Sequence, residues 1–320
     1  MNLQSYATRR TDIETRRTAS FMQQLVSMRN PDGIEPLFCI HPSGGDIGIY
    51  RKLATRLKPT RAIFGIQSRL VCGARTEYSS LEEMAHQYTQ IIEMQQPEGD
   101  IKLLGFSLGG FVATLIARDL HRSGRDVSFL GLIDSNPGWI VVSENSRTLS
   151  EQSYQQLCTR LAQVFFKFQE IGVMRKKPSE TVHRDVSIIV DACLLDDPAR
   201  SSTEIMALTT KLGYVPDRQV DANALNKFTN TFLAHSKLLR DYRPPQIHCP
   251  LSLWWPSETE SQNIEGSEIW SQHAHSTVTE SVIKGSHYSI MRGAPVRKLA
   301  TELESEIERS VSQLFGEMAK

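Results

Sequence analysis

The segment Ile101-Lys-Leu-Leu-Gly-Phe-Ser-Leu-Gly-Gly110 decides the fold of this chain. Ile101 to Phe106 is a short apolar run with the length of a buried strand, and Leu108 to Leu120 carries its apolar residues on one helical face. Between them, Gly105 to Gly109 matches G-x-S-x-G, in which a serine lies at a sharp turn from strand to helix. The pattern also occurs as a structural turn, but both flanks here are those that a nucleophile requires. Ser107 is therefore the predicted nucleophile.

The residues around Ser107 fit this role on steric and electrostatic grounds. A serine held in a strained turn requires glycine on both sides for clearance, and Gly110 would allow the helix to approach the strand closely. A helix that begins at Leu108 directs its first N–H groups and its positive end towards the serine. The Leu108 N–H is thus a predicted donor to the oxyanion that forms when a carbonyl is attacked.

The alternation of strand and helix extends to both sides of this segment. Such a series is typical of a mostly parallel sheet with helices on its faces. Strands are predicted at Leu37–Ile40, Ala62–Ile66, Ser128–Ile133, Pro250–Trp255 and Thr277–Ile283, and helices at Ile49–Leu57, Leu81–Met94 and Pro295–Phe315.

The predicted domain organisation is one interrupted core. Residues 36–138 and 241–320 form the α/β core, whereas residues 139–240 have helical periodicity and are predicted to be a helical insertion. Residues 1–35 are interpreted as an arm that leads into a possible first strand.

Composition limits the classes of partner. Lysine plus arginine and aspartate plus glutamate both total 36 in 320 residues, so no net field favours nucleic acid or an anionic membrane. No run approaches the roughly 18 apolar residues of a membrane span, and the polar N-terminus is unlike a signal peptide, so a cytoplasmic location is expected. The five cysteines are scattered and predicted to be reduced core residues, with no metal-site spacing.

A serine hydroxyl needs a neighbouring base, and His287 is the predicted one among nine histidines. It follows the last predicted strand within Gly285-Ser-His-Tyr288 and precedes the closing helix. The third residue must be a carboxylate in a loop after a strand. Asp134 ends a buried run and gives the order Ser, Asp, His, while Glu258 and Glu260 are the alternatives after the next strand. Asp134 is preferred because Ser257–Ser261 is polar enough for a solvated loop, although Asp-Ser-Asn-Pro is also typical of a turn.

The second oxyanion donor is predicted in His41-Pro-Ser-Gly-Gly45, which follows the first clear strand. A backbone N–H from such a loop completes the hole, and the Ser43 amide is the expected donor. The alternative, a phosphate-binding loop, lacks the Gly-Lys-Ser or Gly-Lys-Thr that normally follows. His41 is then interpreted as a loop-shaping residue.

These segments together resemble the thioesterase domains of nonribosomal peptide synthetases and polyketide synthases, type I-like members of the α/β-hydrolase superfamily. The resemblance runs through Leu25–Arg29, Pro36–Gly45, Gly105–Gly110, Leu132–Ser135 and Gly285–Tyr288. It implies the α/β-hydrolase fold, places the acid directly after the strand that follows the serine helix, and identifies residues 139–240 with the family's lid.

The resemblance also implies an activity. Ser107 would take an acyl chain from the phosphopantetheine arm of an acyl or peptidyl carrier protein, and the chain would be released by hydrolysis or cyclisation without a bound cofactor or metal. The alternatives are transfer to an external amine or alcohol, a general carboxylesterase, and a noncatalytic binding relative. The natural acyl chain does not follow from the sequence.

Overall fold

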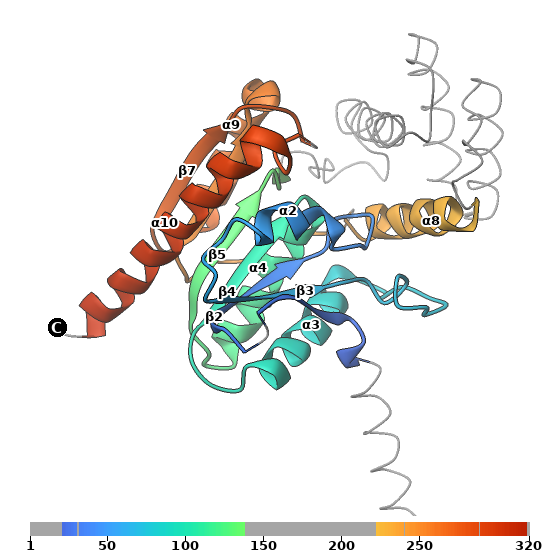
Figure 1. Ribbon diagram of the computed structural model, residues 1–320, viewed down its shortest axis with the longest axis horizontal. Helices are drawn as coiled ribbons and strands as arrows, with labels where there is room; N and C mark the ends of the chain where they lie inside the picture. Colours follow the sequence, from blue (N-terminus) through green and yellow to red (C-terminus); the bar gives the residue numbers. More distant parts are fainter. Residues whose placement is uncertain (1–20, 31, 138–221, 240, 288, 319–320) are drawn as a thin grey trace, which may run out of the picture. The chain divides into compact units, whose positions relative to one another are not determined.

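One sheet forms the centre of the described structure. The computed structural model describes residues 21–30, 32–137, 222–239, 241–287 and 289–318 (Figure 1). Within these ranges seven strands lie in the order β1-β3-β2-β4-β5-β6-β7. β1 pairs antiparallel with β3, and every other neighbouring pair is parallel. The strands are β1 (Leu25–Arg29), β2 (Ile34–Ile40), β3 (Arg61–Ile66), β4 (Ile101–Phe106), β5 (Val127–Ile133), β6 (Leu251–Pro256) and β7 (Val278–Ile283).

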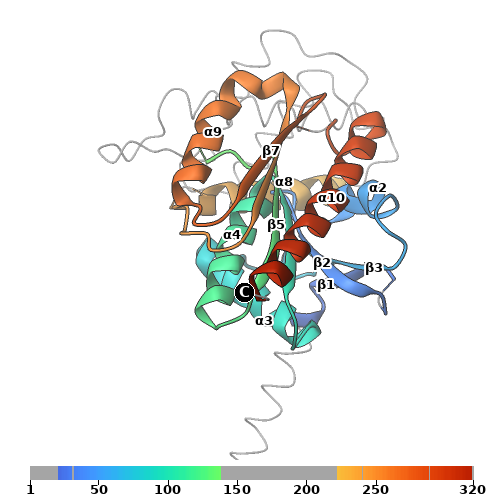
Figure 2. The same cartoon turned by 90° about the vertical axis from the view of Figure 1, so that its left-hand side faces the viewer.

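Helices cover both faces of this sheet (Figure 2). On one face α2 (Arg51–Ala54) contacts the long α10 (Gly293–Met318). On the other, α3 (Leu81–Gln95) packs on α4 (Leu108–Arg122), and α9 (Glu260–His273) contacts β6 and β7. The predicted alternation of strands and helices, with a mostly parallel sheet, is confirmed, and β1 is the first strand expected before residue 36.

Two local predictions were wrong. The helix predicted at Ile49–Leu57 is a 3-10 turn, η1 (Gly48–Tyr50), followed by the short α2. The stretch Ser257–Ser261, predicted as a solvated loop, is the 3-10 turn η3 (Ser257–Thr259) and the start of α9. Helix α9 begins in a polar run, and further along it contacts the rest of the fold through the buried Gly266 and Trp270, which lie four residues apart on one side of the helix.

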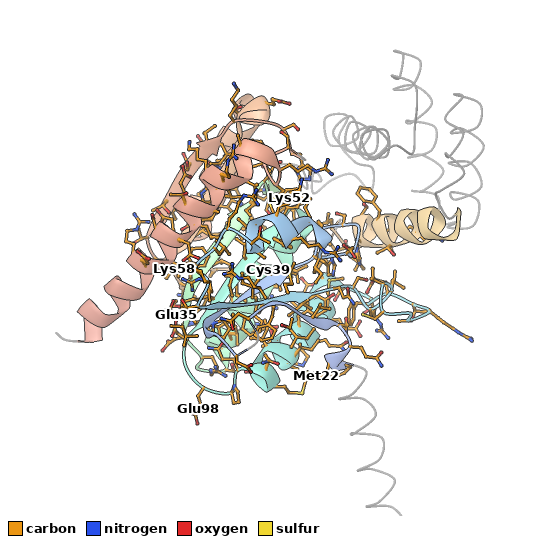
Figure 3. The ribbon with its side chains drawn as sticks, viewed as in Figure 1. Met22, Glu35, Cys39, Lys52, Lys58 and Glu98 are labelled. Atoms are coloured by element: carbon orange, nitrogen blue, oxygen red, sulfur yellow. The ribbon has the colours of Figure 1, made fainter. Side chains whose placement is uncertain are left out.

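Two of the three described cysteines are core residues, as predicted. Cys39 and Cys249 are buried and free, and Cys39 lies inside the sheet among core side chains (Figure 3). Burial raises the pKa of the Cys249 thiol to about 12 and also raises the pKa of Cys39, so both stay protonated and unreactive at neutral pH. Cys72 is free and half-buried, while Cys158 and Cys193 lie outside the described residues.

The chain divides into two compact units, each considered by itself. Residues Met1–Asn136 with Arg243–Lys320 make the first, and Pro137–Tyr242 the second. Helix α8 (Ala222–Leu239) is the helix described in the second unit, so most of the predicted insertion at 139–240 lies outside the described residues and stays a prediction. Among the residues described, no helix is long and apolar enough to cross a bilayer, and no group of three or more His, Cys, Asp or Glu side chains is arranged to hold a metal ion.

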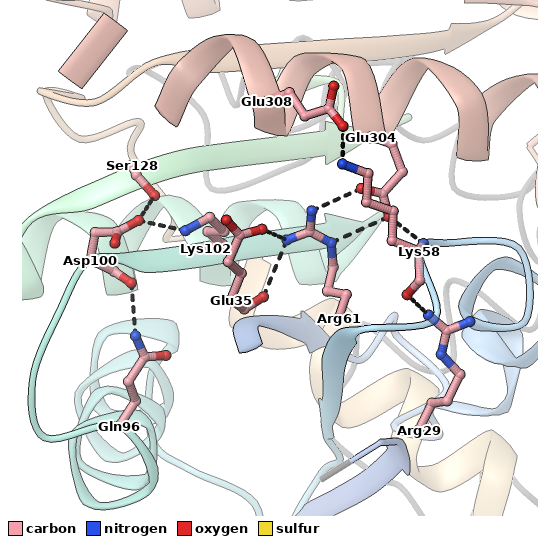
Figure 4. A network of polar contacts seen from close by, with 10 residues as sticks. All are labelled: Arg29, Glu35, Lys58, Arg61, Gln96, Asp100, Lys102, Ser128, Glu304 and Glu308. Atoms are coloured by element: carbon pink, nitrogen blue, oxygen red, sulfur yellow. Dashed lines mark hydrogen bonds and ion pairs between the residues drawn. The ribbon is translucent and has the colours of Figure 1, made fainter. Parts of the chain in front are cut away.

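A buried ion-pair network ties α10 to the amino-terminal ends of the strands (Figure 4). Arg61, the first residue of β3, is 1% exposed and donates to both carboxylate oxygens of Glu304, at 2.8 and 3.3 Å. Its guanidinium also lies 3.1 Å from the Glu35 carboxylate, and the Lys58 N–H donates to Glu304 at 2.7 Å. The network is at the end of the sheet opposite Ser107, so it stabilises the fold and not the site.

Replacing Glu304 with alanine is expected to lower the free energy of unfolding by about 3 kcal/mol, because the buried Arg61 cation loses its bidentate partner. Urea denaturation measures the change. Lys298→Ala is the control: it removes an exposed pair with Glu302 on the same helix and should cost less than about 1 kcal/mol. Equal losses of unfolding free energy in the two variants would contradict a stabilising role for the Arg61–Glu304 pair.

The same pair gives a pH dependence of stability. Burial alone would raise the pKa of Glu304, but the hydrogen bonds from Arg61 and Lys58 outweigh it and hold the pKa below its ordinary value. The folded state therefore binds this proton less readily than the unfolded state, so the stabilisation is present above the ordinary glutamate pKa, about 4.3, and is lost as pH falls through the lower folded value. Unfolding curves below about pH 4.5 should show a smaller acid-induced loss for Glu304→Gln than for the wild type.

Candidate active site

The three residues of the predicted triad lie at the carboxyl ends of strands in the same sheet. Ser107 follows β4, Asp134 follows the adjacent β5, and His287 lies in the loop after β7. In parallel sheets of this kind, sites form at this edge, because loops from separate strands meet there. All three side chains are at least nine-tenths buried within the fold.

Ser107 adopts a backbone conformation that side chains rarely accept. Its φ is 57° and its ψ is −123°, and the next residue begins helix α4. A Cβ on Gly105 would lie 2.3 Å from the Gly109 backbone, and one on Gly109 would lie 2.2 Å from the Ile40 carbonyl oxygen. The flanking glycines are therefore required by close approach of backbone to backbone, as the motif predicts, and the strain is held by the surrounding contacts.

Asp134 and His287 form a hydrogen bond. His287 Nδ1 lies 2.5 Å from Asp134 Oδ2, and the Asp134 side chain is fully buried. Asp134 has a φ of 45°, and its N–H donates to the Trp254 carbonyl of β6, which fixes the turn. Its second oxygen, Oδ1, is buried without a hydrogen-bond partner among the described residues. Because the carboxylate accepts from Nδ1, the imidazole has Nε2 as its basic nitrogen.

The loop that carries His287 is fixed on both sides. The imidazole stacks on Phe106, the residue before Ser107, with ring centroids 4.6 Å apart and planes inclined by 27°. The Gly285 N–H donates to Ser257 Oγ at 3.1 Å, and the Gly285 carbonyl accepts from the Glu258 N–H at 3.0 Å. Glu258 thus contributes a backbone bond to the histidine loop and has an exposed side chain, while the carboxylate that reaches His287 is Asp134.

The glycine-rich loop after β2 lies against the first turn of α4. Gly109 has no side chain, so the carbonyls of Ile40 and His41 can approach its backbone closely. His41 is fully buried, with Nδ1 2.8 Å from the Pro42 carbonyl and Nε2 2.7 Å from the Tyr88 hydroxyl. A carbonyl only accepts, so Nδ1 carries the proton and the Tyr88 hydroxyl donates to Nε2. These bonds connect His41 to its own loop and to Tyr88 of α3, and its loop-shaping role stays a prediction. The Ser43 amide as oxyanion donor stays a prediction.

Tyr50 joins the two strand ends that lead to the predicted oxyanion donors. Its buried hydroxyl donates to the Ile40 carbonyl at the end of β2 and accepts the Phe106 N–H at the end of β4, both at 2.7 Å. Burial raises the pKa of this hydroxyl well above its usual value, so it stays protonated and able to donate at neutral pH.

Tyr50→Phe is expected to lower the free energy of unfolding by about 2 kcal/mol, because a buried N–H and a buried carbonyl both lose their partner. Chemical denaturation measures the change. Tyr78→Phe is the matched control: the buried Tyr78 hydroxyl bonds one group among the contacts described, the Gln24 side chain, so its loss leaves one partner unsatisfied instead of two and should cost less. A Tyr50 variant as stable as the wild type would contradict the bridging role.

The sequence matches a known protein family over most of its length. A model of the thioesterase domain family matches residues 35–307. The chain belongs to the thioesterase domain family. The resemblance expected from the motif segments is thereby confirmed, and the matched range includes Ser43, Ser107, Asp134 and His287.

Curated relatives of this thioesterase domain are large synthases. A dimodular nonribosomal peptide synthase of Bacillus subtilis is 36% identical over 126 residues, which cover 39% of this chain and 5% of that protein. The polyketide synthase PksR of the same organism is 29% identical over 204 residues, which cover 63% of this chain and 7% of that protein. The chain thus spans a small part of each relative's length.

A solved structure supports the fold. The NocB thioesterase domain, in covalent complex with a fluorophosphonate nocardicin G analogue, matches with a TM-score of 0.57 at 18% identity, over 90% of this chain and 99% of that one. The likeness confirms the α/β-hydrolase fold expected from the sequence.

Three residues near the site were not predicted from the sequence. Tyr50, Ser135 and Ser257 each fix a loop through a hydroxyl, at sites 56, 28 and 28 residues away. Such contacts leave no spacing or periodicity in the sequence. The only sequence feature that pointed to any of them was Ser135 beside Asp134, within an Asp-Ser-Asn-Pro segment that was interpreted as typical of a turn.

Proposed function

We propose that this chain releases an acyl, peptidyl or polyketide chain from the phosphopantetheine thioester of a carrier protein through an ester on Ser107. The observation that carries the proposal is the Asp134–His287 hydrogen bond, with the imidazole stacked on the residue before Ser107, in a member of the thioesterase domain family. The catalytic roles of Ser107, Asp134 and His287 belong to the proposal.

In the first half-reaction His287 Nε2 takes the proton of Ser107 Oγ as that oxygen attacks the thioester carbonyl. The Nδ1–H donates to Asp134 throughout, which stabilises the imidazolium. The N–H groups of Leu108 and Ser43 stabilise the oxyanion of the tetrahedral intermediate. When the C–S bond breaks, the departing thiolate takes the proton from Nε2 and leaves the acyl group on Ser107.

In the second half-reaction water, or a nucleophile within the chain itself, gives its proton to His287 Nε2 and attacks the ester. Collapse of the intermediate returns the proton to Ser107 Oγ and frees an acid or a cyclic product. The expected absence of a bound cofactor and the cytoplasmic location remain predictions. By family resemblance, residues 139–240 are proposed as the lid that shapes the acyl pocket.

The sharpest test compares two substrates on one protein. A carrier-bound acyl thioester and a simple aryl ester of the same acyl group are offered, and the acyl-enzyme is followed by intact mass. The proposal expects an adduct on Ser107 and a higher kcat/KM with the carrier-bound substrate. Equal or higher kcat/KM with the aryl ester would favour a general carboxylesterase, and product mass separates hydrolysis from cyclisation and from transfer to an added amine.

A further inference from the structure

A buried hydroxyl contacts the backbone of Ser107 from the loop that carries Asp134. Ser135 is fully buried, and its Oγ donates to the Ser107 carbonyl oxygen at 2.8 Å. A second, longer contact of 3.3 Å reaches the Ile133 carbonyl. The Ser107 carbonyl also accepts the Gly110 N–H at 3.0 Å, so two donors fix this oxygen.

The carbonyl of Ser107 belongs to the same peptide group as the N–H of Leu108. A peptide group is planar and trans, so its C=O and N–H point in opposite directions, and fixing the oxygen fixes the direction of the N–H. Leu108 is the first residue of α4, and its N–H has no acceptor within the helix. A hydrogen bond to the carbonyl also polarises the peptide group, which strengthens its N–H as a donor.

Ser135 is itself held in place. The Trp270 Nε1–H of α9 donates to the Ser135 carbonyl at 2.8 Å, and Trp270 is fully buried. On the opposite side, a Cβ on Gly110 would lie 2.0 Å from Ser135 Oγ, so the hydroxyl occupies the space that a side chain on α4 would need. The hydroxyl is therefore confined between α4 and the end of β5, with the Ser107 carbonyl as the nearer of its two acceptors.

We propose that Ser135 is a positioning residue for the oxyanion donor: its hydroxyl orients and polarises the Ser107–Leu108 peptide group so that the Leu108 N–H points at the developing oxyanion. The inference rests on the proposed function, because it assigns a role within the same reaction. It also links the acid to the nucleophile, since Asp134 and Ser135 are adjacent and each contacts a different catalytic element.

The test is Ser135→Ala, with three readouts in the full chain. Since a lost oxyanion donor costs about 10²–10³-fold and this variant only weakens one, kcat should fall about 10-fold or more, with KM little changed. The inhibition constant of a trifluoromethyl ketone, whose adduct on Ser107 carries an oxyanion, should rise by the same factor. The ¹⁵N shift of the Leu108 amide should move, since it reports the bond to the preceding carbonyl.

Thr114→Val is the matched control. Thr114 is a fully buried residue of α4 whose hydroxyl donates to the Phe111 carbonyl at 2.7 Å, away from the Ser107 peptide group. It should leave kcat within about twofold and the Leu108 shift unmoved, because its lost bond affects stability alone. If Ser135→Ala fails to fold, Ser135→Cys decides: the thiol is a weaker donor and should give a smaller change in the same three readouts.

The outcomes separate the two proposals. A folded Ser135 variant with wild-type kcat, inhibition constant and Leu108 shift overturns the inference while leaving the proposed function intact. A wild-type protein that neither binds the ketone nor turns over any carrier-bound thioester or aryl ester overturns the proposed function, and the role of Ser135 with it. Parallel losses in kcat and ketone affinity, absent from Thr114→Val, support the inference.

Discussion

Ser107→Ala is expected to abolish turnover, lowering kcat by about 10⁶-fold, because the proposed acyl ester forms on the hydroxyl that this substitution removes. The loss should be in kcat with substrate affinity retained, since the substitution removes one hydroxyl and leaves the predicted oxyanion donors Ser43 and Leu108 in place. Carrier-bound thioester hydrolysis measures it, and intact mass after treatment with a fluorophosphonate gives a second readout: one adduct on the wild type and none on the variant.

Ser123→Ala is the control for this prediction. Ser123 caps the other end of α4, is exposed, and donates to the Leu120 carbonyl, so its loss should leave both readouts unchanged. Persistent labelling of Ser107→Ala would place the nucleophile elsewhere, and absence of labelling in the folded wild type would favour the noncatalytic binding alternative.

Asp134→Asn is expected to lower kcat by about 10⁴-fold while preserving the fold. The asparagine amide can donate to His287 Nδ1, which then carries no proton, and Nε2 becomes the protonated nitrogen that cannot accept from Ser107. Fluorophosphonate labelling should slow in parallel, because the same proton transfer precedes attack. Steady-state kinetics at saturating substrate measure kcat, and labelling reactions quenched at successive times measure the rate of fluorophosphonate labelling.

Asp126→Asn is the matched control, since Asp126 is an exposed aspartate just before the opposite end of β5. It should change neither rate. A near-normal kcat in Asp134→Asn, with Glu258→Gln inactive instead, would show that the acid acts from the strand end favoured in the alternative prediction.

The sequence predicted those features that have a local cause. A strand, a glycine-flanked serine and an amphipathic helix are contiguous, so the elbow at Ser107 follows from one short segment and its φ of 57° agrees. His287 and Asp134 were predicted from chain order relative to the strands, and the structure brings these two together. The catalytic roles themselves await the experiments above.

Features that depend on distant contacts were not predicted. Helix α9 begins among polar residues and is fixed through Trp270, whose indole N–H meets Ser135 across 135 residues. The buried cation at Arg61 was equally unforeseen, because its partner Glu304 lies 243 residues away on α10. Periodicity reports which face of an element is apolar, but it does not report which polar groups meet inside the fold.

The Tyr50 hydroxyl bridges the carboxyl ends of two neighbouring strands, β2 and β4. It accepts from the Phe106 N–H and donates to the Ile40 carbonyl, and so adds a side-chain bridge to the backbone pairing of β2 with β4. If the proposed function holds, this bridge would be the same for every acyl group bound at Ser107. Differences in the length, shape or polarity of the acyl chain would then be accommodated by residues outside this bridge. Substitutions there could change substrate selectivity without altering the proposed catalytic residues.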